Sequence, residues 1–168
     1  MRPMAHLSHR ALGLAIALGA AFALGIALAA ERWGGLVPCA LCLWERWPYR
    51  AATALGLLAV LLSPKTARAA FALTALTMLA GTVLGAIHAG VEFHWWPSPL
   101  PECAAPSLGG SGSIAELLAR MPAAPAKPCD DPTYLIRGLP VSMAQMNLIA
   151  AAAFAATAIW ATIRRPRA

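Results

Sequence analysis

The chain has 168 residues, of which 60% are hydrophobic and 12% are charged, and its mean hydropathy is +0.64. A soluble domain of this length cannot bury so much apolar surface. The composition therefore excludes an ordinary water-soluble protein and indicates one integral membrane domain over residues 1–168. The net charge of +6 does not indicate nucleic-acid binding, because the basic residues flank apolar runs and form no basic patch interleaved with aromatic residues.

The first predicted transmembrane span covers residues 11–30, a run without a charged residue. At about 1.5 Å per residue, a helix of this length crosses a hydrocarbon core of about 30 Å. A cleaved signal peptide is the alternative, since Arg10 precedes the run and Ala27-Leu28-Ala29 resembles a cleavage site. We favour a retained span because the apolar core of a signal peptide has only about 7–15 residues.

The second predicted span, residues 43–62, is charged in its first two turns and uncharged only over 51–62. Charged side chains at that depth can reach the lipid headgroups, where aromatic residues are also favoured. Pro48 removes one backbone donor from this opening stretch and can kink the helix.

A tight turn predicted at 63–66 leads to a third span at 69–89. Within this span, Gly81 and Gly85 form a G-x-x-x-G pattern, which permits close helix packing but also arises by chance in alanine-rich helices. The fourth predicted span covers 141–163. The predicted fold is therefore an all-α bundle of four transmembrane helices.

The spans are joined on one side of the membrane by a short loop at 31–42 and a long loop at 90–140. The long loop contains nine of the chain's 14 prolines, so regular structure is expected to be scarce there. One short amphipathic helix is predicted, because Ser113-Ile114-Ala115-Glu116 forms a capping box and the apolar residues up to Met121 share a face. This helix would lie on the membrane surface or cover the end of the bundle.

The basic residues predict the orientation of the chain. Seven of them, and no acidic residue, fall at the termini and in the turn between the second and third spans; they are Arg2, Arg10, Lys65, Arg68, Arg164, Arg165 and Arg167. By the positive-inside rule both termini are cytoplasmic and all four cysteines face the opposite compartment. In a bacterium this places the chain in the inner membrane, with its cysteines in the oxidising periplasm.

Cys39 and Cys42 form a Cys-x-x-Cys pair between the first two spans. A dithiol with this spacing is a redox or metal-binding device, and the small ring of its disulfide favours electron transfer. Arg46 stands four residues after Cys42, so it shares a helical face with that cysteine and can stabilise a thiolate or an anion beside it. The alternatives are a structural zinc site for the cysteines and a snorkelling anchor for Arg46.

Cys103 and Cys129 enclose a proline-rich loop of 25 residues. They are expected to be exposed and mobile, which favours thiol exchange over a purely structural staple. No metal is expected, because these two cysteines lack the close spacing of a zinc knuckle.

Three groups of residues carry a family resemblance: Pro38-Cys39-Ala40-Leu41-Cys42 with Glu45-Arg46, Pro97-Ser98-Pro99 ahead of Cys103, and Cys129-Asp130 ahead of Gly138-Leu139. Together they resemble the disulfide bond formation protein B (DsbB) family over nearly the whole chain. The resemblance implies a four-helix membrane enzyme, a quinone-dependent protein-disulfide oxidoreductase. Such an enzyme reoxidises a periplasmic, thioredoxin-like thiol oxidase of the DsbA type and passes the electrons to ubiquinone or menaquinone, and so to the respiratory chain.

The resemblance also implies a role for each cysteine. The partner's thiolate attacks the disulfide at Cys103, the freed Cys129 exchanges with Cys39, and the Cys42 thiolate then lies beside the quinone. Arg46 would stabilise the negative charge that develops on the thiolate and on the reduced quinone.

His88 and Glu92 lie four residues apart at the outer end of the third span, and His94 follows closely. Any of the three is a candidate for handling the protons of a quinone, and His88 and Glu92 are candidates for binding it. The alternative is that an interfacial histidine is only a polar end residue. The residues around His88 resemble a subset of the family, so the choice of partner can differ within it.

Three rival functions agree less well with the sequence. In vitamin K epoxide reductase-like enzymes the loop cysteines precede the Cys-x-x-Cys pair, whereas here they follow it. A metal-binding or transport protein would need ionisable residues deep in the spans, and 11–30 and 69–89 have almost none. A structural membrane protein with a disulfide-stapled loop predicts no loss of activity when Cys39 and Cys42 are reduced.

Overall fold

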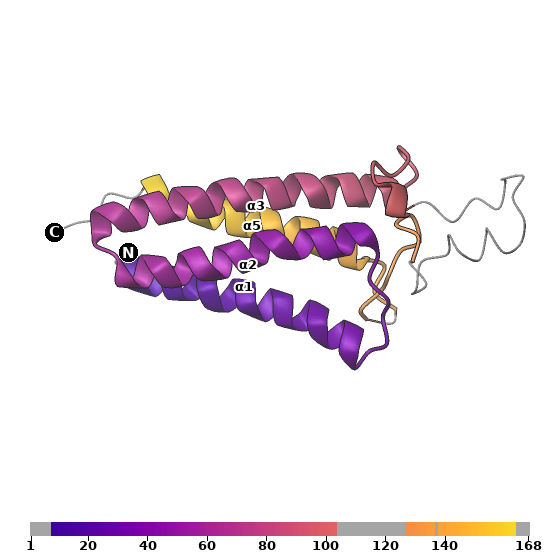
Figure 1. Ribbon diagram of the computed structural model, residues 1–168, viewed down its shortest axis with the longest axis horizontal. Coiled ribbons are helices and arrows are strands. Elements are labelled where there is room, and N and C mark those ends of the chain that lie inside the picture. The colour runs from indigo at the N-terminus through magenta and orange to yellow at the C-terminus, as the bar shows by residue number, and fades with distance from the viewer. Residues whose placement is uncertain (1–7, 104–126, 137, 164–168) are drawn as a thin grey trace, which may run out of the picture.

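The computed structural model describes residues 8–103, 127–136 and 138–163 (Figure 1). Over these residues it contains no strand, one 3-10 turn and four long helices: α1 (His9–Arg32), α2 (Ala40–Leu61), α3 (Pro64–Glu92), η1 (Pro101–Cys103) and α5 (Met143–Ile163). The all-helical fold predicted from the sequence is confirmed. The amphipathic helix predicted near residues 113–121 lies outside the described residues.

Three of the described helices, α1, α3 and α5, are long and apolar enough to cross a membrane. Helix α2 has 22 residues, but it carries Glu45, Arg46 and Arg50. Glu45 and Arg46 point into the bundle and are only 6% and 9% exposed. Facing protein rather than lipid is the arrangement expected of ionisable residues at membrane depth. The fourth crossing, by α2, stays a prediction.

Helices α2 and α3 both begin earlier than predicted. Helix α2 begins at Ala40 and not near residue 43, because the Cys39 sulfur accepts the backbone N–H of Cys42 at 3.2 Å and so acts as its N-cap. The Cys-x-x-Cys pair therefore opens a helix, and the predicted loop at 31–42 is correspondingly shorter. Helix α3 begins at Pro64, so most of the predicted turn at 63–66 is its first turn. Proline suits that position because its missing N–H would have no partner within the helix.

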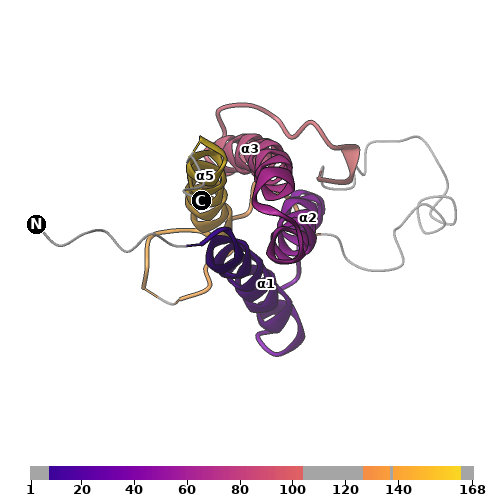
Figure 2. The ribbon, with the colours of Figure 1, turned by 90° about the vertical axis from the view of Figure 1, so that its left-hand side faces the viewer.

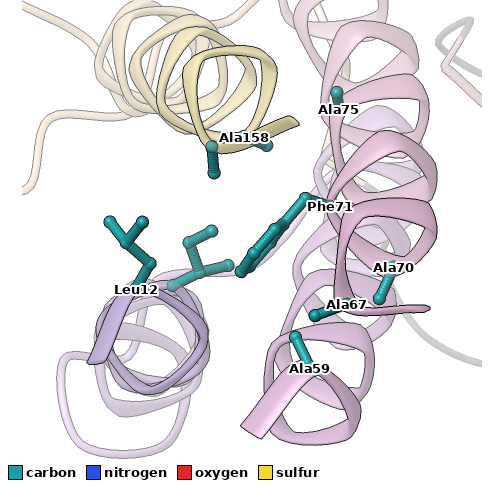
Figure 3. Close-up of a cluster of buried hydrophobic side chains, with 9 residues drawn as sticks. Leu12, Ala59, Ala67, Ala70, Phe71, Ala75 and Ala158 are labelled. Carbon is teal, nitrogen blue, oxygen red and sulfur yellow. The ribbon is translucent and has the colours of Figure 1, made fainter. Parts of the chain in front are cut away.

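The long helices are arranged in the order α1, α2, α3, α5 around the bundle (Figure 2). Each packs along the next, whereas α1 and α5 barely touch. At the end that holds the start of α1, the ring of Phe71 fills the space between α1, α3 and α5, among Leu12 and several alanines (Figure 3). Toward Arg32, α1 diverges from the other helices (Figure 1). The bundle is therefore closed at one end and open between α1 and α5 at the other.

The two glycines of the G-x-x-x-G pattern lie where α3 meets two different helices. A Cβ atom on Gly81 would lie 3.0 Å from the Cβ of Pro48 in α2. A Cβ atom on Gly85 would lie 3.0 Å from the Cα of Leu148 in α5. The pattern thus permits close packing on both sides of α3, and α2 continues as a helix through Pro48.

Candidate functional site

All four cysteines lie at the open end of the bundle, where α2 begins and α3 ends. Cys39, Cys103 and Cys129 share one buried apolar cluster with Leu41 and Val91, and Cys42 packs against it. Segments far apart in the chain therefore meet here, because η1 and the segment around Cys129 pack against the start of α2 and the end of α3. The predicted grouping of the two cysteine pairs on one side of the bundle is seen directly in this cluster.

The Cys39 and Cys42 sulfurs lie 2.9 Å apart and are joined by a thiol hydrogen bond. The pKa of Cys39 is lowered from its ordinary value, first by this hydrogen bond and further by the backbone N–H of Cys42, while burial acts in the opposite direction. A sulfur held at a helix N-terminus in this way is stabilised as a thiolate. This arrangement favours thiol–disulfide exchange at the Cys39–Cys42 pair.

Cys103 and Cys129 form a disulfide with their Cα atoms 5.0 Å apart. The prediction that these cysteines are exposed is wrong: Cys103 is 4% exposed and Cys129 is 1% exposed. They are covered because η1 and the residue 129 segment pack onto Leu41 and Val91 at the end of the bundle. A protein thiol that attacks this disulfide must first displace part of that covering.

A cavity of about 220 Å³ opens where α1 diverges, between α1, α2 and α5. Most of its wall is apolar, and the first turns of α2 contribute four polar or thiol side chains to it. These lining residues include Cys42, Glu45, Arg46 and Tyr49, with Glu31 from α1 and Asn147 from α5. Among the described residues that form this wall, Cys42 is present but Cys39 is not. The two sulfurs of the pair therefore face different surroundings.

Arg46 forms an ion pair with Glu31 at 2.7 Å, and its side chain is only 10% exposed. A snorkelling anchor would instead extend its guanidinium group to the water interface. The burial of Arg46 beside Cys42 in the cavity wall is the geometry predicted from their four-residue spacing. Glu31 was missed from the sequence, where its only signal is a lone acidic residue at the end of the first apolar run.

His88 is 2% exposed and lies between α3 and α2. Its Nδ1 atom lies 3.0 Å from Oε1 of Glu45, and its Nε2 atom lies 3.5 Å from the Cys39 sulfur. Its polar partners, Glu45 and Cys39, thus lie near the start of α2 and at its N-cap. His88 does not line the cavity described above, whereas Glu45 does.

Glu92 lies apart from the cavity and accepts a hydrogen bond from the hydroxyl of Ser142, the residue before α5. That hydroxyl also accepts the backbone N–H of Gln145 at 3.2 Å, so Glu92 ties the end of α3 to the cap of α5. His94 is largely exposed and lies 3.9 Å from Asp130. Of the three residues predicted to bind a quinone, Arg46 lines the cavity, whereas His88 and Glu92 do not.

Cys39, Cys42 and His88 bring their potential ligand atoms within 4.8 Å of one another. Two thiols and an imidazole are zinc ligands, but the same arrangement is that of a thiol with a general base. Since the thiols belong to a Cys-x-x-Cys pair beside a second cysteine pair, the redox interpretation accounts for more of the cluster.

Comparison with protein families gives one match, which covers residues 9–161: the family described as disulfide bond formation protein DsbB. The comparisons with curated proteins and with solved structures found no match. The matched range contains all four cysteines, the whole of α1, α2 and α3, and all but the last two residues of α5.

Proposed function

Because the chain belongs to the disulfide bond formation protein DsbB family of membrane thiol–disulfide oxidoreductases, we propose that it is a quinone-dependent protein-disulfide oxidoreductase. It reoxidises a periplasmic DsbA-like oxidase with a thioredoxin fold and passes two electrons to a membrane quinone. One observation carries the proposal: Cys39 packs with the Cys103–Cys129 disulfide, whereas Cys42 lines the cavity. The pair thus stands between an electron donor and a site for an acceptor.

The electrons enter at the loop disulfide. A thiolate of the partner attacks Cys103, which forms an intermolecular disulfide and releases Cys129 as a thiolate. Cys129 then attacks Cys39 of an oxidised Cys39–Cys42 pair, which forms a Cys129–Cys39 bond and releases Cys42 as a thiolate. The partner's second thiolate attacks its own mixed disulfide and releases Cys103. Cys103 then attacks Cys129, so the loop disulfide is restored and Cys39 and Cys42 carry the two electrons.

The cavity residues fit a quinone. A cavity of about 150 Å³ accommodates benzene, so about 220 Å³ is enough for one substituted ring, and the walls are mostly apolar. Arg46 offers hydrogen-bond donors there, and the side-chain nitrogen of Asn147 is buried without a partner. When bound, the quinone accepts two electrons and two protons. Arg46 holds a fixed positive charge near Cys42, where negative charge develops.

The proposal includes an orientation in the membrane. The start of α1, the α2–α3 turn and the end of α5 lie together at the end of the bundle opposite the cysteines (Figure 1). The basic residues of the sequence gather in and next to these segments. This supports a bacterial inner-membrane protein with four spans, cytoplasmic termini and periplasmic cysteines.

The test is quinone reduction by the full-length protein in detergent or membranes, driven by a reduced thioredoxin-fold partner. Each single change, Cys39→Ser, Cys42→Ser, Cys103→Ser and Cys129→Ser, is expected to abolish turnover, because each sulfur carries one step of the exchange. Full activity in Cys42→Ser would refute the scheme. Loss of stability without loss of turnover in Cys103→Ser would favour the alternative of a disulfide-stapled structural protein.

A further inference from the structure

A buried polar chain connects Cys39 to the cavity. It runs from the Cys39 sulfur to Nε2 of His88, 3.5 Å away, and from Nδ1 of His88 to Oε1 of Glu45, 3.0 Å away. His88 and Glu45 are only 2% and 6% exposed. Burying two ionisable groups is unfavourable unless they are paired, and here the two groups satisfy each other between α3 and α2.

The two ends of this chain lie in different surroundings. Cys39 belongs to the apolar cluster that holds the loop disulfide, and among the described residues neither Cys39 nor His88 lines the cavity. Glu45 does line it, together with Cys42. Cys42 can therefore release a proton to the cavity directly, whereas Cys39 has no such direct route. His88 and Glu45 connect the Cys39 sulfur to the cavity wall through two contacts.

We propose that His88 is the general base for the Cys39 thiol and that Glu45 orients His88 and passes the proton on to the cavity. The inference rests on the proposed function, in which the reduced Cys39–Cys42 pair is oxidised from the cavity. It assigns His88 to the thiol and not to direct contact with a quinone. A thiol, an imidazole and a carboxylate in sequence are the arrangement of nucleophile, base and orienting group used in nucleophilic catalysis.

The step balances in electrons and protons. Oxidation of the reduced pair forms the Cys39–Cys42 disulfide and releases two electrons and two protons, which the quinone takes up. One proton leaves from Cys42 at the cavity wall. The Cys39 proton moves to Nε2 of His88 as the proton on Nδ1 moves to the Glu45 carboxylate, which faces the cavity. Glu45 then releases this proton to the cavity and is later reprotonated from there. When the pair is next reduced, Nε2 returns a proton to the Cys39 thiolate and Nδ1 takes one from Glu45, which restores the starting tautomer.

The charged and titratable groups around His88 come from α2, which packs against it, and from its own helix α3. Glu45, Cys39 and Cys42 face it from the start of α2, and Glu92 acts on it from its own helix α3. Glu92 is held by Ser142 and lies near Lys127, so its charge has partners elsewhere. The Cys103–Cys129 disulfide beside Cys39 does not titrate. Glu45 and Cys39 are thus the groups in direct contact with the imidazole.

The test measures the Cys39 thiol in reduced, quinone-free, full-length protein. The rate of Cys39 alkylation by iodoacetamide is followed against pH by mass spectrometry in the wild type, His88→Gln and Glu45→Gln. Loss of the imidazole is expected to move the profile of His88→Gln to higher pH by about one unit, so that Cys39 reacts about tenfold more slowly at pH 7. Glu45→Gln is expected to move in the same direction by less, because an amide oxygen can still orient the ring.

His94→Gln is the matched control, because His94 is exposed and lies outside this buried chain. Its alkylation profile is expected to match the wild type. An unchanged profile in both His88→Gln and Glu45→Gln would overturn the inference, and if His88→Gln does not fold, Glu45→Gln decides alone.

Quinone turnover separates this inference from the proposed function. His88→Gln is expected to lower kcat by about 10²-fold, the usual contribution of a general base, and to leave KM for quinone unchanged. Normal kcat in His88→Gln would overturn the inference while the proposed function stood. Absence of quinone reduction in the wild type would overturn the proposed function, whereas the alkylation profiles would still report whether His88 acts on Cys39.

Discussion

At the scale of single residues, the ion pair between Arg46 and Glu31 defines one wall of the cavity. The buried Arg46 and the partly exposed Glu31 lie 2.7 Å apart and hold each other in one geometry, and both line the same cavity as Cys42. The spacing of Cys42 and Arg46 in the sequence predicts that they share a helical face. It does not predict Glu31, because that contact depends on how α1 packs against α2.

Replacing Arg46 tests whether its charge serves the cavity. Arg46→Ala is expected to raise the apparent KM for quinone by about tenfold or more, since a hydrogen bond to a charged group contributes about 1.5–3 kcal/mol. KM for the protein partner is expected to stay within about twofold in steady-state assays.

Arg50→Ala is the control for that measurement. Arg50 is exposed, and its guanidinium group lies 4.8 Å from the centre of the Trp47 ring, away from the cavity wall. Its KM for quinone is expected to match the wild type. Equal KM values for quinone in Arg46→Ala and the wild type would indicate that Arg46 is only a membrane-surface anchor.

At the scale of helices, close packing of α1 on α2 fixes the position of the cavity. A Cβ atom on Gly56 in α2 would lie 2.8 Å from the carbonyl oxygen of Gly13 and 2.9 Å from the backbone nitrogen of Ala17. Both contacts are to backbone atoms of α1, which cannot move aside without shifting the helix. The backbones of α1 and α2 are therefore in close contact between the start of α1 and the point where α1 diverges.

Gly56→Ala is expected to lower stability by about 1–3 kcal/mol through overpacking, measured as a lower Tm or faster unfolding in detergent. Gly25→Ala is the matched control, because a Cβ atom on Gly25 in α1 meets no atom within 4 Å. The control is expected to be neutral or slightly stabilising, as alanine favours helix over glycine. Equal loss in both variants would show that the α1–α2 contact is not what limits stability.

The sequence predicts some of these helices better than others, for physical reasons. Long uncharged runs are sufficient to predict α1, α3 and α5, since hydropathy alone requires a bilayer around them. The predicted start of α2 is too late. In the sequence Glu45 and Arg46 are typical of the edge of a span, because their pairing with His88 and Glu31 depends on contacts with other helices. Capping by the Cys39 sulfur is likewise a contact that hydropathy does not encode.

The features of the candidate site also divide into those that the sequence predicts and those that it does not. Cysteine spacing and the Cys42–Arg46 register are local, so they could be predicted from the sequence. The contact of His88 with Cys39 joins residues 49 positions apart, and the burial of Cys103 and Cys129 depends on how two loop segments cover the bundle end. The prediction that those cysteines are exposed is wrong because a proline-rich sequence does not reveal how η1 and the Cys129 segment pack on the bundle.

At the scale of the whole molecule, the bundle has two different ends. One end is filled around Phe71, and the other holds the cysteine cluster with the cavity beside it (Figures 1 and 3). A donor that reaches the loop disulfide and an acceptor that enters between α1 and α5 thus approach the same Cys-x-x-Cys pair from different sides. This separation suits a protein that must keep its two substrates from reacting without it.

Labelling of single cysteines tests the proposed orientation. In a variant without the native cysteines, Lys65→Cys at the α2–α3 turn is expected to react with a membrane-impermeant maleimide only after intact bacterial cells are permeabilised. His94→Cys at the other end is expected to react in cells whose inner membrane is intact. Labelling of both positions from the same side would contradict four membrane crossings.

The most direct test of the central claim, that Cys42 is the junction between the thiol relay and the quinone, is an absorption spectrum. Purified Cys39→Ser protein, in which Cys42 has no disulfide partner within its pair, is mixed with oxidised quinone. A thiolate beside the quinone is expected to give a charge-transfer band in the visible range. The band is expected in Cys39→Ser and not in Cys42→Ser. A band that persists in Cys42→Ser, or one that is missing in Cys39→Ser, would refute the placement of Cys42 beside the quinone.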